Sequence, residues 1–138
     1  MTYLTSTADE TIALGERLAR DLPRRGAVLL TGNLGAGKTT LAKGIVKGLG
    51  AADPDDVTSP TFTLIHEYGG GRVCHVDLYR LDDPRQVANL GLDDLFENAL
   101  VLIEWGERFP QLMPARRTEI GIRALESDER QIEVIERS

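Results

Sequence analysis

Apolar residues at helical spacing predict a first helix near the start of the chain. Thr7 to Glu10 has the Thr-x-x-Glu form of a capping box, and apolar residues follow at mostly helical intervals until Pro23. The capping box satisfies backbone N–H groups at a helix start, and a proline cannot continue the helix. We therefore expect a helix over about residues 8–21.

The next pattern is a buried strand, a glycine-rich turn and a second helix. Residues 27–30 form a continuous apolar run bounded by Gly26 and Gly32, which is typical of a strand covered on both faces. Helical spacing resumes in residues 41–49 and stops at Gly50. Strand, turn and helix therefore follow one another directly.

Strands and short helices alternate in the second half of the chain. Residues 61–68 and 72–79 are β-rich runs separated by three glycines, which predicts a hairpin. Asp83 and Pro84 supply an N-cap and a first-turn proline for a helix, and a second short helix is expected over residues 93–98.

Two further apolar patterns complete the sheet. Residues 99–103 form a continuously apolar run, as a central parallel strand should. Residues 120–124 and 132–134 alternate apolar and polar positions, which predicts a half-exposed antiparallel hairpin. The sequence predicts an α/β fold, with a mixed sheet, helices on both faces and an antiparallel hairpin portion.

Composition narrows the classes of protein. The 138 residues are 41% hydrophobic and 28% charged, which suits a single domain over residues 1–138 with its own core. The lone cysteine, Cys74, lies in an alternating apolar stretch and indicates a core residue of a cytoplasmic protein. We expect no membrane segment. The net charge of −6 argues against broad nucleic-acid binding but allows a small phosphate ligand.

The turn after the first strand carries the clearest chemistry. Residues 32–39 match G-x-x-x-x-G-K-[ST] between a predicted strand and a predicted helix, the context of a P-loop. Its glycines let backbone N–H groups face a phosphate, Lys38 reaches the β- and γ-phosphates, and the Thr39 hydroxyl can bind Mg²⁺. The predicted nucleotide-binding residues in this segment are Asn33, Gly35, Ala36, Gly37, Lys38, Thr39 and Thr40. The domain is therefore expected to be a three-layer P-loop NTPase-like domain.

Two carboxylates at strand ends compete for the magnesium site. Glu104 ends the continuously apolar run, whereas Asp77 ends a strand that His75 interrupts, which suggests that this second strand has a wetter face. We assign Glu104 to the metal together with Thr39, and Asp77 to the attacking water or to residues that support the metal ligands. Lys38, Asp77 and Glu104 are the expected catalytic residues. A carboxylate that merely caps the next turn is the alternative for each acid.

Several other residues have weaker signals. Ser59 and Thr61 lie where a switch segment could reach the γ-phosphate, although a plain turn is nearly as well supported. The two histidines have no zinc-ligand spacing and are interpreted as packing or surface groups. Trp105 is equally compatible with a hydrophobic anchor and a contact near the nucleotide. The pairs Arg24–Arg25 and Arg116–Arg117 are interpreted as solvated loop charges.

The absence of a guanine-binding motif bears on which nucleotide the P-loop would bind. The guanine-reading motif Asn/Thr-Lys-x-Asp does not occur, because no lysine is followed two positions later by aspartate. This favours ATP.

Taken together, these segments resemble the TsaE family of small bacterial ATPases. The resemblance rests on the P-loop and on three shorter matches further along the chain, namely Ser59–Leu64, His75–Arg80 and Ile103–Trp105. It implies ATP and Mg²⁺ as ligands, Thr39 and Glu104 at the magnesium, Asp77 at a second acidic site, and Arg130 near the base. It also implies TsaD and TsaB as partners in forming threonylcarbamoyladenosine in tRNA, with tRNA contacted only through the complex.

Three functions stay open on the residues alone. The leading hypothesis is partner-coupled ATP hydrolysis. A small-molecule kinase would need an acceptor pocket and an arginine-bearing lid, and no lid pattern is recognisable. A nucleotide-gated adaptor would bind ATP and dock on a partner with negligible hydrolysis.

Overall fold

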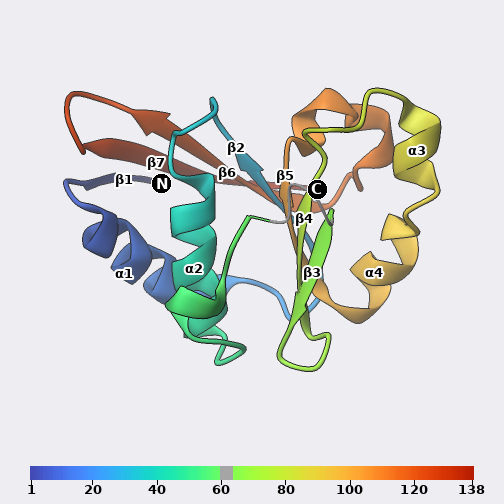
Figure 1. Ribbon diagram of the computed structural model, residues 1–138, viewed down its shortest axis with the longest axis horizontal. Coiled ribbons are helices and arrows are strands. Elements are labelled where there is room, and N and C mark those ends of the chain that lie inside the picture. The colour runs from blue at the N-terminus through green and yellow to red at the C-terminus, as the bar shows by residue number, and fades with distance from the viewer. Residues whose placement is uncertain (60–63) are drawn as a thin grey trace.

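A mixed β-sheet forms the centre of the molecule. The computed structural model describes residues 1–59 and 64–138. Within these residues the strands form one seven-stranded sheet in the order β1-β7-β6-β2-β5-β4-β3 (Figure 1). The strands are β1 (Thr2–Thr5), β2 (Gly26–Thr31), β3 (Ile65–Tyr68), β4 (Val73–Asp77), β5 (Leu100–Glu104), β6 (Arg117–Ala124) and β7 (Arg130–Arg137).

The four inner strands are parallel and the outer strands are antiparallel. β2 pairs in parallel with both β5 and β6, and β5 pairs in parallel with β4. β3, β7 and β1 add antiparallel pairings at the two edges. Leu30 of β2 is the register partner of Glu104, and Glu104 is in turn the partner of Asp77. The carboxyl ends of three neighbouring strands therefore meet at the P-loop.

Helices cover both faces of the sheet, which confirms the predicted fold class. α1 (Ala8–Leu18) and α2 (Lys38–Gly48) pack on one face, while α3 (Pro84–Ala88) and α4 (Leu92–Asn98) lie on the other (Figure 1). Four single-turn 3-10 segments connect the elements: Ala19–Asp21, Pro54–Asp56, Gly106–Arg108 and Pro110–Leu112. None of the described helices has both the length and the apolar character needed to cross a membrane.

Most sequence-predicted elements are present, with three differences. β1 was not predicted, and it pairs with β7 at the sheet edge. The predicted strand over residues 61–68 is a strand only from Ile65, and residues 60–63 lie outside the described part of the chain. Arg117 begins β6 instead of standing in a loop, and it forms an ion pair with Glu119 at 2.7 Å. Cys74 is buried as predicted.

Glycines let α1 and α2 approach each other closely. A Cβ added at Gly15 would lie 2.6 Å from the carbonyl oxygen of Leu41, and one added at Gly44 would collide with the carbonyl oxygen of Ile12. Both obstacles are backbone atoms, so side-chain rotation cannot relieve the clash. The helix that begins at Lys38 is thus held against α1 by contacts that only glycine permits.

Gly44→Ala is expected to destabilise the fold because it forces α1 and α2 apart. Overpacking at such a contact costs about 1–3 kcal/mol. Urea denaturation should show this loss, whereas Lys47→Ala, at an exposed position of the same helix, should change the unfolding free energy by less than about 0.5 kcal/mol. Equal stability of the two variants would contradict the close helix contact.

Candidate functional site

The P-loop curls between β2 and α2 because glycines occupy its left-handed positions. Gly37, directly before α2, has φ 111°, and Gly32 has φ 146°. A side chain at Gly32 would also collide with the carbonyl oxygen of Ile122 on β6. The Ala36 N–H donates to the Asn33 carbonyl at 3.0 Å and closes a tight turn. The backbone N–H groups at the start of α2 are therefore directed into the loop, the arrangement that binds phosphate.

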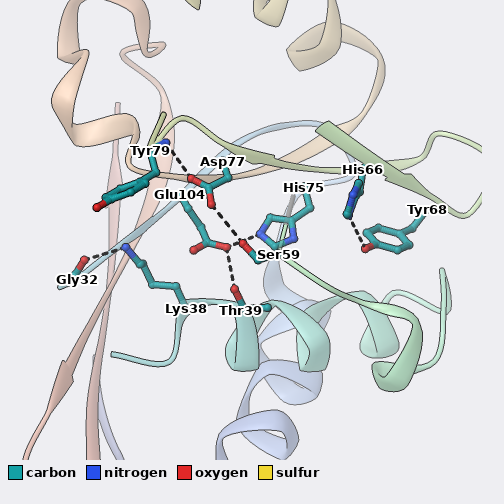
Figure 2. A network of polar contacts seen from close by, with 10 residues as sticks. All are labelled: Gly32, Lys38, Thr39, Ser59, His66, Tyr68, His75, Asp77, Tyr79 and Glu104. Carbon is teal, nitrogen blue, oxygen red and sulfur yellow. Dashed lines mark hydrogen bonds and ion pairs between the residues drawn. The ribbon is translucent and has the colours of Figure 1, made fainter. Parts of the chain in front are cut away.

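Lys38 lies across the mouth of this loop. Its ammonium donates a hydrogen bond to the Gly32 carbonyl at 2.9 Å (Figure 2). The same ammonium stands 3.5 Å from the centroid of the Trp105 ring. The residue is only 4% exposed. Burial lowers the pKa of the ammonium below its ordinary value, while three nearby carboxylates, Glu104 foremost, oppose that shift. An anionic ligand would add to this opposing effect and favour the charged amine.

Trp105 forms an aromatic wall beside the lysine. Its backbone has φ 67°, an uncommon value for a residue with a large side chain. The Trp105 and Tyr79 rings stand 5.3 Å apart at a tilt of 50°. Of the two roles that the sequence left open, the structure favours a contact beside the P-loop, because Trp105 lies next to the P-loop lysine.

Glu104 is joined to Thr39 and to His75. The Thr39 hydroxyl donates to Glu104 Oε2 at 3.1 Å, and His75 Nε2 stands 2.6 Å from the same oxygen (Figure 2). His75 is fully buried, and every residue of β4 is buried. The predicted wetter face of this strand is therefore wrong: β4 lies inside the sheet between β5 and β3, and His75 uses its polar ring to contact a carboxylate. Nor is His75 only a packing or surface group.

Asp77 lies one strand further from the P-loop than Glu104. Its Oδ1 accepts from the Tyr79 N–H at 2.9 Å, and its Oδ2 accepts from the Ser59 hydroxyl at 3.3 Å (Figure 2). Ser59 thus ties the segment after α2 to an acid at the end of a strand. Thr61, the other predicted switch residue, lies outside the described residues.

Most of these groups, although not Gly32 or His75, line one cavity of about 350 Å³. Its walls include most of the residues predicted from the sequence: Gly35, Gly37, Lys38, Thr39, Thr40, Ser59, Asp77 and Glu104. Leu34, Tyr79 and Trp105 complete the lining. Asn33 and Ala36 belong to the loop backbone but do not line the cavity.

Arg130 braces the P-loop from β7. Its Nε donates to the Ala36 carbonyl at 2.9 Å, and its terminal nitrogen Nη1 donates to the carbonyls of Ser127 and Glu129. The arginine therefore reaches the P-loop backbone, although it stands outside the cavity lining. The last hairpin is thereby linked to the predicted phosphate loop.

The donor set beside the P-loop fits magnesium. Mg²⁺ prefers oxygen ligands and is usually bound through one or two carboxylates together with phosphates and water. The Thr39 hydroxyl and the Glu104 carboxylate both line the cavity beside the P-loop, so a phosphate-bound ion there would meet two oxygen donors.

Comparison with known proteins identifies the family. Residues 5–132 match the family described as "Threonylcarbamoyl adenosine biosynthesis protein TsaE". The chain belongs to the TsaE family. A Nostoc protein named tRNA threonylcarbamoyladenosine biosynthesis protein TsaE is 46% identical over 109 residues, which cover 74% of this chain and 65% of that relative. A Bacillus subtilis protein of the same name is 38% identical, over 94% of this chain and 82% of its own length.

A solved structure extends the family likeness to three dimensions. The crystal structure of Bacillus subtilis YdiB superposes with a TM-score of 0.77 and 32% sequence identity, over 99% of this chain and 84% of that one. The α/β fold with a mixed sheet is therefore shared with a solved structure. The TsaE resemblance noted from scattered sequence motifs is confirmed.

Proposed function

We propose that this TsaE-family protein is a Mg²⁺-dependent ATPase that serves the biosynthesis of threonylcarbamoyladenosine in tRNA. One observation carries the proposal. The P-loop, Lys38 and the Thr39–Glu104 pair converge on a single cavity, where phosphate and a divalent cation would be bound side by side. The family membership supplies the biological process.

The proposed chemistry is stabilisation of charge on transferring phosphate. Lys38 would release the Gly32 carbonyl and bind the β- and γ-phosphates, and the backbone N–H groups of the loop would cradle the β-phosphate. Mg²⁺, held through Thr39 and Glu104, would supply positive charge next to the phosphates. Lys38 and Glu104 are both 4% exposed, and charges held in so little contact with water interact more strongly.

Asp77 is proposed to orient the attacking water. It stands beside Glu104 in the register of neighbouring strands, and its carboxylate is held by the Ser59 hydroxyl and the Tyr79 N–H. Its hydrogen bond from Ser59 links this acid to the proposed switch segment, so that a change in the segment would alter the position of the carboxylate. Arg130 is proposed to support the nucleotide through the P-loop carbonyl that it already contacts.

Partners are proposed from the family resemblance. TsaD and TsaB would bind this protein, and tRNA would be contacted through that complex, which suits a chain with a net charge of −6. We further propose that residues 1–138 form one P-loop domain and that the protein acts in the cytoplasm.

We expect the isolated protein to hydrolyse ATP slowly and its partners to accelerate this hydrolysis. Among the arginines of the described residues, none lines the P-loop cavity. An arginine finger contributes about 10³–10⁵ in rate where it operates, so the isolated protein should turn over well below about one ATP per second. Hydrolysis should be measured for the protein alone, with the TsaD–TsaB pair, and with each partner separately.

Nucleotide dependence of partner binding supplies the second half of this test. By linkage, a partner that accelerates hydrolysis by ordering the ATP-bound form should bind more tightly with an ATP analogue than with ADP. Fast turnover alone with nucleotide-independent partner binding would contradict coupling and favour an autonomous kinase. Tight ATP-dependent docking without hydrolysis would favour the adaptor.

A further inference from the structure

A buried histidine contacts the proposed metal-binding carboxylate. His75 on β4 is 0% exposed and Glu104 on β5 is 4% exposed, and their side chains meet at 2.6 Å between Nε2 and Oε2 (Figure 2). β4 and β5 are neighbouring parallel strands, and His75 lies two residues before Asp77, the register partner of Glu104, so the two side chains meet diagonally across the strands. Two polar side chains in the sheet interior are costly unless each satisfies the other.

The hydrogen-bond pattern assigns the proton to His75 Nε2. An ionised carboxylate only accepts hydrogen bonds, so the imidazole must be the donor. The opposite ring nitrogen, Nδ1, is buried and has no hydrogen-bond partner among the described residues. A bare lone pair is the form of Nδ1 that this buried position tolerates best, because an N–H there would lack an acceptor among the described residues. The neutral ring protonated at Nε2 satisfies both conditions.

Both donors act on one oxygen of the carboxylate. Thr39 and His75 each contact Glu104 Oε2, whereas Oε1 receives no hydrogen bond from the described residues. Thr39 is itself a proposed metal ligand, so its hydroxyl would have to turn toward the ion when magnesium binds. His75 faces the carboxylate from within the sheet and can keep its hydrogen bond throughout.

We propose that His75 is a positioning residue for the magnesium site, which orients the Glu104 carboxylate by holding Oε2 and leaves Oε1 directed to the cation. The proposal rests on the proposed function, because it assumes that Glu104 serves magnesium. A histidine with only a packing role would be replaceable by an apolar side chain of similar length. A histidine that positions Glu104 could be replaced only by a side chain that also donates a hydrogen bond to the carboxylate.

The test compares two substitutions of equal length. Gln places its amide nitrogen the same number of bonds from Cβ as His Nε2, and Met has the same length without a donor. Loss of a residue that orients a metal ligand lowers metal affinity by about 10- to 100-fold. His75→Met should therefore raise the Mg²⁺ concentration for half-maximal binding of a non-hydrolysable ATP analogue by about that factor. His75→Gln should restore most of the loss.

Two measurements separate positioning from simple stability. Binding of ADP without magnesium and the thermal unfolding midpoint should be similar in the Met and Gln variants. In the metal-free protein, nitrogen NMR of the two histidines should show one ring held as the Nε2–H form. His66→Met, which changes the only other histidine, should leave the magnesium requirement unchanged.

Each outcome decides the question. If Met and Gln at position 75 give the same magnesium requirement as the unchanged protein, while Glu104→Ala raises it, the positioning role is wrong and the proposed metal site stands. If Glu104→Ala leaves the requirement unchanged, the metal site itself is wrong. A ring protonated at Nδ1 would also overturn the inference.

Discussion

Lys38→Ala is expected to abolish ATP hydrolysis and weaken triphosphate binding while the fold stays intact. Among the described residues, the Lys38 ammonium is the one side-chain cation that lines the cavity. Its hydrogen bond to the Gly32 carbonyl holds it beside the P-loop. Loss of a charge-assisted contact costs about 1.5–3 kcal/mol, or roughly 10- to 150-fold in affinity. Calorimetric titration with MgATP measures the loss directly.

A second lysine of α2 serves as the control. Lys43 is on the same helix and does not line the cavity, so Lys43→Ala should bind MgATP as the unchanged protein does. Thermal unfolding of both variants should be close to that of the unchanged protein. Unaltered MgATP affinity in Lys38→Ala would contradict the proposal that Lys38 binds the phosphates.

Glu104→Ala and Asp77→Asn are expected to fail in different steps. Glu104 contacts Thr39 beside the P-loop, so its removal should weaken the magnesium-dependent part of nucleotide binding. Asp77 lies one strand away and is held by Ser59 and the Tyr79 N–H, so its amide variant should bind MgATP normally. Loss of a group that orients or activates water should slow the chemical step by about 10²–10⁴.

Magnesium titrations of nucleotide affinity, together with single-turnover hydrolysis, separate the two acids. A larger magnesium defect in Asp77→Asn than in Glu104→Ala would mean that the two roles are reversed. Normal single-turnover hydrolysis in Asp77→Asn would instead mean that Asp77 takes no part in the chemical step and serves only to bind the Ser59 hydroxyl.

The sequence predicted the parallel core of the fold well because local patterns determine it. The apolar runs that became β2 and β5 are continuous, and the glycines and the lysine of the P-loop have fixed spacing. β1 escaped prediction for a physical reason. Its four residues form an edge strand in which Thr2 and Leu4 are exposed, and its partner lies at the other end of the sequence.

The candidate site was predicted in its residues but not in its connections. Lys38, Thr39 and Glu104 carry motif signals, and the register of parallel strands brings them together. His75 begins one of the segments that resemble the family, but nothing in the sequence indicated a contact with Glu104. A histidine inside a strand usually indicates a wet face, and only the neighbouring strand reveals a carboxylate in reach. The proximity of Trp105 to Lys38 likewise depends on an unusual backbone conformation that no residue pattern announces.

The strand order also constrains how the protein folds. β2, which leads into the P-loop, has as its sheet neighbours β5 and β6, both synthesised long after it. The pairing of β1 with β7 joins segments separated by nearly the whole described chain. Such non-local pairings slow folding, because long loops must close before the contacts form. During synthesis the P-loop segment therefore emerges well before β5 and β6, the strands that flank β2, and the cavity beside the P-loop is completed only when most of the chain has been made.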